Sequence, residues 1–233
     1  MALYRLFLSS VVTRGRLIAL LLLAVVPVLV GFAIRTNVFA DRTTAGVEMV
    51  AGLGLALVAP VVSLVFASAV LGDPHEYGTL VYLWLRPVAR WRIALAAVLA
   101  ALTVAAPLIV VPLAVASVVV GAGTPLVGGT VAACSLAVVA YTGLFTWLGL
   151  RVKRALPWGL AYVLVWEGFV SRGGKGAAML SVRVHTGTVL SRLADGPADM
   201  VRTTMLTALA IPLGAALVAL SLTIWRLHRQ DVA

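Results

Sequence analysis

Residues 93–119 read IALAAVLAALTVAAPLIVVPLAVASVV, an apolar run of 27 residues without a charged side chain. A helix of about 20 apolar residues crosses the roughly 30 Å hydrocarbon core of a bilayer, so this run is long enough to span a membrane. Backbone groups in lipid must bond within their own segment, and the run lacks the alternation of a barrel strand, so it is predicted to be a helix. Five further apolar runs qualify, at residues 17–34, 48–71, 129–150, 155–171 and 205–225. The predicted fold is an all-α integral membrane protein with six transmembrane helices.

The composition of the whole chain leads to the same class. Of 233 residues, 62% are hydrophobic and 11% are charged, whereas soluble domains carry about 25% charged residues. The 18 Lys and Arg residues outnumber the 8 Asp and Glu residues, giving a net charge of +10. These basic residues fall in short clusters between apolar runs, so we expect no nucleic-acid partner and interpret the charge as a topology signal. The single cysteine, Cys134, excludes an intrachain disulfide.

The basic clusters predict the orientation of the spans. An even number of spans places both termini on one side, and Lys and Arg are enriched in cytoplasmic loops. With cytoplasmic termini, 11 basic residues lie inside and 7 outside. The inner residues are Arg5, Arg14, Arg16, Arg86, Arg90, Arg92, Arg151, Lys153, Arg154, Arg226 and Arg229. We therefore expect a multi-pass protein of the plasma membrane with both termini cytoplasmic, formed by a single domain over residues 1–233.

The start of the chain allows two interpretations. Residues 1–16 place Leu3, Leu6 and Phe7 on one helical face, which predicts a short interfacial helix along the cytoplasmic membrane surface. The alternative is that this segment extends the first span into the headgroup region. A cleaved signal peptide is disfavoured, because the apolar run at 17–34 is longer than a usual signal-peptide core.

The segment between the second and third spans, residues 72–92, carries the most specific pattern. Asp73 suits a helix N-cap, Pro74 the first helical position and Glu76 the capping-box position, so a helix is predicted to begin there. It should end near Arg86, because the residue before a proline is disfavoured in helical conformation.

This loop helix is interpreted as a docking surface. A capped surface helix of roughly 18 Å would need no partner. However, Gly78 in a helix interior costs about 1 kcal/mol relative to Ala, and a closely packed partner would explain its presence. Docking is therefore preferred.

The same segment resembles the permease subunits of ABC-2 type transporters. The resemblance is carried by Glu76-Tyr77-Gly78-Thr79-Leu80, followed by Leu83, Leu85, Arg86-Pro87-Val88, Arg90 and Ile93. The layout of six spans, an N-terminal connecting helix and a larger external region before the last span is also similar to that family. The chain departs from the family at Ala96-Ala97, where many members carry a Gly-Lys pair, so no role of that Lys is transferred.

The resemblance implies that this segment is a cytoplasmic coupling helix, which contacts a separate ATP-hydrolysing subunit. It also implies a second copy of the chain or a homologous permease, with ATP and Mg in the partner subunit and no cofactor bound by this chain. The stretch Gly173-Gly174-Lys175-Gly176 lacks the spacing of a P-loop and its following Ser or Thr. The residues expected to dock the ATPase are Asp73, Glu76, Tyr77, Gly78, Thr79, Leu80, Leu83, Arg86, Pro87 and Arg90.

The short loop between the fourth and fifth spans contains Arg151, Lys153 and Arg154. Anchoring at an anionic membrane surface explains all three basic residues. The resemblance implies a second cytoplasmic contact with the ATPase at the same place. Anchoring is the simpler interpretation.

Glu167 is the only carboxylate well inside a predicted span, where a charge costs about 2.5 to 3.5 kcal/mol on insertion scales. It is expected to face protein or a cavity, and Arg172 or Arg183 could pair with it. A structural ion pair is preferred over a role in substrate passage or gating.

The external loop before the last span, residues 172–204, is predicted to contain a short amphipathic helix. Met179, Val182 and Val189 recur at nearly helical spacing. The turn signal Asp195-Gly196-Pro197 should end this helix.

The preferred function is a non-catalytic permease subunit of an ATP-driven exporter for a hydrophobic or amphiphilic substrate. The alternative is an ion-coupled transporter or channel-like protein without an ATPase, a class that usually shows several intramembrane charges or inverted repeats. An intramembrane enzyme is disfavoured, because His75, His185 and His228 fall in predicted loops or in the tail.

Overall fold

The computed structural model of the chain describes residues 2–36, 41–78, 89–169 and 175–229, and over these residues it contains helices and no β-strand. The helices are α1 (Ala2–Val11), α2 (Arg14–Thr36), α3 (Arg42–Met49), η1 (Val50–Val58), α4 (Ala59–Glu76), α6 (Arg90–Val120), α7 (Thr124–Arg151), α8 (Ala155–Ala161), η2 (Tyr162–Glu167), α9 (Lys175–Ala178), α10 (Val182–Leu193), η4 (Ala198–Met200) and α11 (Met205–Arg229). Of these, η1 and η2 are π-helical and η4 is a 3-10 helix.

Within the described ranges, five helices are long and apolar enough to cross a membrane. Each contains one of the predicted spans and extends beyond it at one end or both, and α3, η1 and α4 form a single continuous helix. The all-α membrane class is therefore confirmed. The five helices are Arg14–Thr36, Arg42–Glu76, Arg90–Val120, Thr124–Arg151 and Met205–Arg229.

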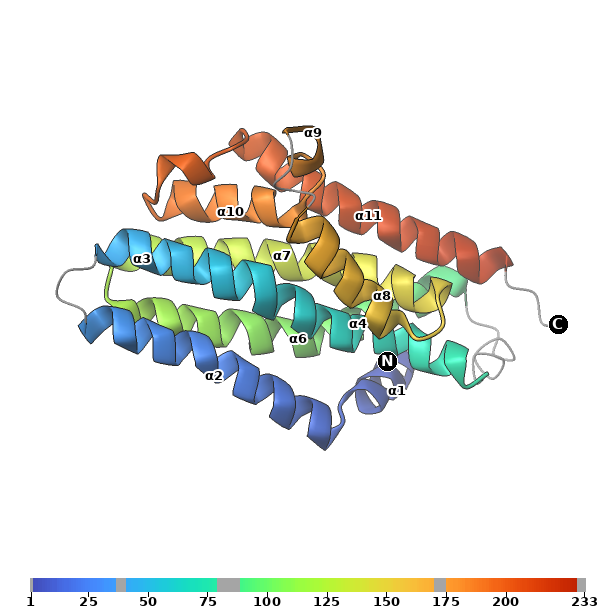
Figure 1. The fold of residues 1–233 in the computed structure, drawn as a ribbon. Helices are drawn as coiled ribbons and strands as arrows, with labels where there is room; N and C mark the ends of the chain where they lie inside the picture. The colour runs from blue at the N-terminus through green and yellow to red at the C-terminus, as the bar shows by residue number, and fades with distance from the viewer. Residues whose placement is uncertain (1, 37–40, 79–88, 170–174, 230–233) are drawn as a thin grey trace.

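The remaining predicted span, at 155–171, is a shorter helix. The seven residues of α8 and the six of η2 reach roughly 20 Å, less than the roughly 30 Å hydrocarbon core. In Figure 1, α10 continues beyond η2 toward the opposite end of the bundle, so two helices in series cover the distance of one span. The six-span layout stays a prediction, and its fifth crossing would be a broken one.

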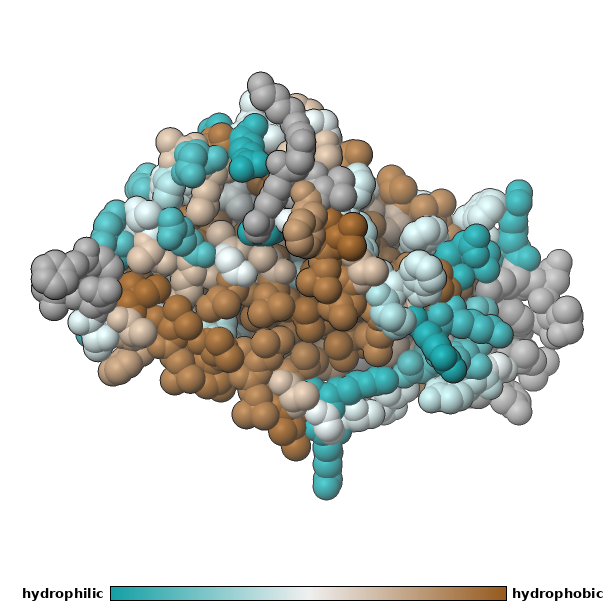
Figure 2. All heavy atoms as spheres, in the orientation of Figure 1, coloured by the Kyte–Doolittle hydropathy of each residue, from teal (hydrophilic) through white to brown (hydrophobic). Residues whose placement is uncertain are grey.

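The helices run between two ends of an elongated bundle (Figure 1). The terminal end carries α1, the junction of α7 with α8 and the C-terminal end of α11. The far end carries the start of α3, the turn between α6 and α7 and the C-terminal end of α10. Figure 2 shows hydrophobic residues across the middle of the face in view and hydrophilic residues toward both ends, as expected of a bundle that spans a membrane.

The second span and α7 form the centre of the bundle. In their apolar windows 61% of the residues are buried, against 22% in α2 and 17% in α11. Small residues let α4 and α7 approach closely, because a β-carbon on Gly149 would overlap the backbone carbonyl of Ser68. Gly143 lies in the same way against Ala216 of α11.

The N-terminal segment forms a helix of its own. α1 ends at Val11 and α2 begins at Arg14, and α1 packs against α6. The side chain of Phe7 is fully buried, and the Tyr4 hydroxyl donates a hydrogen bond to Thr103 Oγ1 at 3.0 Å. The alternative in which this segment only lengthens the first span is therefore wrong, whereas its position along the membrane surface stays a prediction.

The predicted helix in the loop before the last span is α10. The Ser181 hydroxyl accepts the Val184 N–H at 3.3 Å as its N-cap. The helix ends before Asp195, which adopts a left-handed φ of 50°. The end predicted at Asp195-Gly196-Pro197 is confirmed.

The close contact between α4 and α7 predicts a destabilising substitution. Gly149→Ala is expected to lower the melting temperature of the purified chain, because the new β-carbon meets backbone atoms of Ser68 that cannot rotate away, and overpacking costs about 1 to 3 kcal/mol. The matched control is Gly128→Ala in the same helix, where a β-carbon meets nothing within 4 Å. Thermal unfolding in detergent compares the two, and an unchanged melting temperature for Gly149→Ala would contradict the described packing.

Candidate functional site

The prediction that a separate helix begins at Asp73 is wrong. α4 runs without interruption to Glu76, so Asp73 and Pro74 lie in its last turn instead of at a new N-terminus. The Asp73 carboxylate forms an ion pair with Arg16 Nη2 at 3.1 Å, at the start of α2. The predicted N-cap and capping-box roles of Asp73 and Glu76 are therefore replaced by a contact between two spans. A proline near a helix end removes only one backbone donor, so an Asp-Pro pair can stand at the start of a helix or in its last turn.

Gly78 terminates α4. Its φ of 69° lies in the left-handed region that favours glycine, and its N–H donates to the His75 carbonyl at 3.4 Å. A β-carbon at this position would meet nothing within 4 Å. Helix termination accounts for Gly78, so this glycine does not require a packed partner.

The end of α4 presents an exposed surface. Glu76, Tyr77 and Gly78 are exposed, and 79% of the Tyr77 surface is open to solvent. The predicted docking residues Thr79, Leu80, Leu83, Arg86 and Pro87 lie outside the described residues.

A cavity of about 190 Å³ at the terminal end joins the two predicted cytoplasmic contacts. Asp73 and Glu76 line it from α4, and Arg154 lines it from the turn between α7 and α8. Arg151 and Lys153 are exposed next to it in the sequence. The fold thus brings together residues that the sequence assigned to two separate loops. We refer to this cavity and the exposed end of α4 as the terminal-end site.

Two arginines connect the helices around the terminal-end site. Arg90 Nη1 donates to the Leu227 carbonyl near the end of α11, and Arg226 Nε donates to the Leu150 carbonyl near the end of α7 at 3.4 Å. The last carbonyls of a helix lack partners within the helix and favour a nearby cation. Arg90, which the sequence placed among the docking residues, therefore also joins α6 to α11.

Glu167 lies at the end of η2 and is buried, with 2% of its surface exposed. Its carboxylate accepts hydrogen bonds from the Ser181 hydroxyl, from the N–H of Val182 at 3.1 Å and from the N–H of Arg183 at 3.4 Å. The Tyr162 hydroxyl donates to it at 3.4 Å. The first N–H groups of a helix have no partner within it and favour a negative charge. Glu167 therefore caps α10 from the end of η2.

The burial predicted for Glu167 is confirmed. The sequence suggested the side chains of Arg172 or Arg183 as partners, and the hydrogen bonds above add a hydroxyl and the backbone of α10, which the sequence did not suggest. Arg172 lies outside the described residues. The cap favours a structural role for Glu167 over one in substrate passage.

Polar side chains that the sequence analysis did not single out hold the segment after α10 against the helix. Ser191 and Arg192 follow Thr188 by three and four residues, so the three side chains share one side of α10. This spacing is the signal in the sequence that could have identified them. Their bonds run from Ser191 Oγ to the Pro197 carbonyl at 2.8 Å, from Thr188 Oγ1 to the Met200 carbonyl at 3.3 Å and from Arg192 Nη2 to the Thr203 carbonyl at 3.2 Å.

A comparison with protein-family models matches residues 13–171, more than half of the chain, to a family described as ABC-2 family transporter protein. The matched range contains the terminal-end site from Arg16 to Arg154, and it extends past Glu167. No curated protein matches the chain.

The cap on α10 predicts that Glu167 is needed for stability. Glu167→Ala should lower the melting temperature clearly, because it leaves several buried donors without an acceptor, at about 1 to 3 kcal/mol each. Glu167→Gln should have a smaller effect, since the amide keeps one acceptor oxygen. Glu48→Gln, at an exposed position of α3, is the control. If Glu167→Ala melts at the temperature of the parent chain, the carboxylate is not an essential cap.

Proposed function

The chain belongs to the ABC-2 transporter family, and from this premise we propose that it is the membrane-spanning permease subunit of an ATP-driven exporter. ABC-2 permeases normally work with an ABC ATPase subunit. In this proposal, a separate nucleotide-binding subunit holds ATP and Mg²⁺ and hydrolyses the nucleotide. The chain itself is non-catalytic and moves a hydrophobic or amphiphilic substrate, a class that suits its apolar and nearly charge-free spans.

The terminal-end site carries this proposal. Asp73 and Glu76 from the last turn of α4 and Arg154 from the turn before α8 line the same cavity, and Tyr77 stands exposed beside them. An exposed aromatic side chain between charged groups of both signs is a surface that a protein partner can bury. We propose that the ATPase docks here and contacts both loops at once.

The continuity of the second span supports a route from the docked ATPase into the membrane. Its helix runs unbroken from Arg42 to Glu76, and the C-terminal half of this helix contacts α7 closely at Gly149. A displacement of Glu76 and Tyr77 would therefore move a rigid element in the centre of the bundle. Nucleotide binding in the partner would bias two arrangements of the spans, as in other ligand-driven switches.

The same proposal sets the orientation in the membrane. An ATPase that uses cellular ATP must dock from the cytoplasm, so the terminal end would be cytoplasmic and the far end external. The basic residues at the terminal end, among them Arg151, Lys153 and Arg154, agree with the enrichment of Lys and Arg in cytoplasmic loops. Both termini would then lie in the cytoplasm.

Exposed apolar surface supports the proposed dimer. Leu22, Leu29 and Phe32 on α2 are each more than 60% exposed, as is Leu217 on α11. Such surface is covered by lipid or by protein in a membrane. We propose that part of it packs against a second copy or a homologous permease, and that lipid covers the rest.

The docking proposal predicts the effect of two substitutions at the end of α4. Glu76→Arg and Tyr77→Ala should each reduce the ATPase that copurifies from native membranes at least about fivefold, as expected of central interface residues. Both side chains are exposed, so the variants should fold normally. Leu206→Ala, equally exposed on α11 near the far end, is the matched control. Full recovery of an ATPase with both variants would contradict docking at this site.

A further inference from the structure

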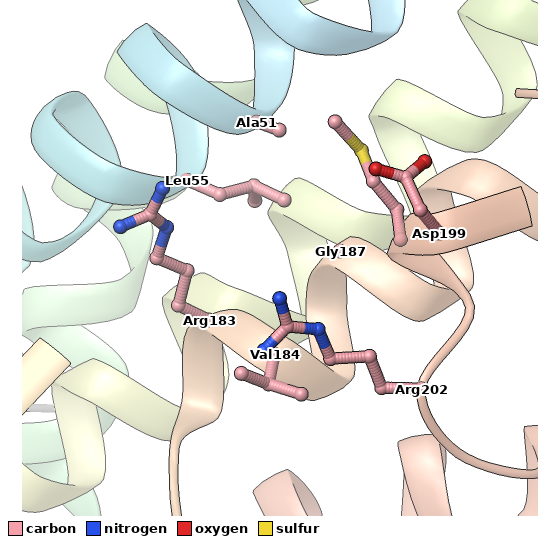
Figure 3. A pocket seen from close by; sticks show the side chains of 8 residues that line it. Ala51, Leu55, Arg183, Val184, Gly187, Asp199 and Arg202 are labelled. Atoms are coloured by element: carbon pink, nitrogen blue, oxygen red, sulfur yellow. The ribbon is translucent and has the colours of Figure 1, made fainter. Parts of the chain in front are cut away.

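A second cavity lies at the far end, on the side of the bundle where η1, α10 and η4 meet (Figure 3). Its volume is about 220 Å³. We refer to it as the far-end pocket. The residues that line it are Ala51, Leu55, Arg183, Val184, Gly187, Asp199, Met200 and Arg202.

Two guanidinium groups reach this pocket from different elements. Arg183 extends from the first turn of α10 and Arg202 from the segment after η4, and the side chain of Arg202 runs toward Val184 (Figure 3). Arg183 is partly buried, whereas Arg202 and Asp199 are exposed. With two cations and one carboxylate, the lining has a formal charge of +1.

The positions of both arginines are set by hydrogen bonds of the backbone. The Arg183 N–H donates to Glu167 at 3.4 Å, and the Arg202 N–H donates to Thr188 Oγ1 at 3.4 Å. Thr188 also donates to the Met200 carbonyl at 3.3 Å. The backbone at both arginines is therefore held by the fold, so a ligand would have to order only their side chains, which favours binding.

Part of the wall is apolar and belongs to the second span. Ala51 and Leu55 line it from η1. The helix from Arg42 to Glu76 has 35 residues, about 50 Å, which exceeds the roughly 30 Å hydrocarbon core by several residues at each end. A helix centred in the bilayer would place Ala51 and Leu55 within about two turns of the hydrocarbon boundary, close to the lipid headgroups.

We propose that the far-end pocket binds a phosphate group, with the headgroup of an anionic membrane lipid as its first source. Guanidinium groups bind phosphate oxygens with paired, charge-assisted hydrogen bonds. Asp199 at the rim accepts a hydrogen bond from a hydroxyl of the headgroup. Pockets for complete drug-sized ligands measure about 300 to 1,000 Å³, so this smaller one of about 220 Å³ holds a headgroup and leaves the acyl chains in the bilayer.

Binding to this pocket needs neither ATP nor an ATPase, so the inference stands or falls separately from the proposed function. The test uses the full chain in phosphatidylcholine nanodiscs, with phosphatidylglycerol titrated into the bilayer and retained lipid counted by native mass spectrometry. Phosphatidylglycerol should be retained by the parent chain in preference to phosphatidylcholine. Inorganic phosphate, added to the chain in detergent, is the parallel probe for a free anion and is followed by the melting temperature.

Two variants address the pocket. Arg202→Gln should weaken retention of phosphatidylglycerol about tenfold, the loss typical of one charge-assisted hydrogen bond. Gly187→Leu should block the pocket, because a β-carbon on Gly187 meets nothing within 4 Å and the side chain enters the space that the ligand needs. The matched controls are Arg35→Gln, which removes one positive charge at the far end outside the pocket, and Gly128→Leu, which adds a side chain in open space on α7.

If both pocket variants lose the preferential retention of phosphatidylglycerol and both controls keep it, the result supports a lipid headgroup as the ligand. If inorganic phosphate stabilises the parent chain but not Arg202→Gln, and no lipid is preferentially retained, the result supports the phosphate site and assigns it to a free anion. Equal retention of phosphatidylglycerol by the parent chain, Arg202→Gln and Gly187→Leu overturns the proposal, and so does a parent chain that responds to neither probe.

Discussion

A helix whose first N–H groups are buried must find acceptors for them within the protein, because they have no partners within the helix. In this chain Glu167 supplies the acceptor for α10. A buried carboxylate and buried donors are each costly when left alone, and here they satisfy one another. The start of α10 therefore depends on Glu167 together with the N-cap hydroxyl of Ser181. Through Arg183, at the second position of α10, the same cap helps to place the far-end pocket.

The second span links the two sites of the molecule. Its far half lines the far-end pocket through Ala51 and Leu55, and its other end lines the terminal-end site through Asp73 and Glu76. Between them lies its close contact with α7 at Gly149. A permease needs such an element, because a movement at the ATPase side must reach the opposite side of the membrane. The arrangement gives the proposed ATPase site and the proposed phosphate site a common rigid element.

The sequence predicted those features that depend on local composition. Five spans follow from apolar length alone, and the end of α10 follows from Asp195-Gly196-Pro197. The start of the loop helix was misplaced, because Asp73-Pro74 satisfies the rules for a helix start and also fits the last turn of a longer helix. Nothing local pairs Asp73 with Arg16, or Glu167 with the backbone of α10, since both contacts arise only when distant segments pack together. The far-end pocket was missed for the same reason.

The central claim is that the exposed end of α4 contacts an ATPase, and site-specific cross-linking tests it most directly. The native Cys134 is buried, so a cysteine introduced by Tyr77→Cys provides an accessible thiol at the proposed interface. Treatment of native membranes with a thiol-to-amine cross-linker, followed by identification of the attached protein, reports what lies next to Tyr77. The account predicts a cross-linked ABC ATPase at this position and none from Leu206→Cys at the far end. Cross-linking at Leu206→Cys but not at Tyr77→Cys, or to no ATPase at either position, would contradict it.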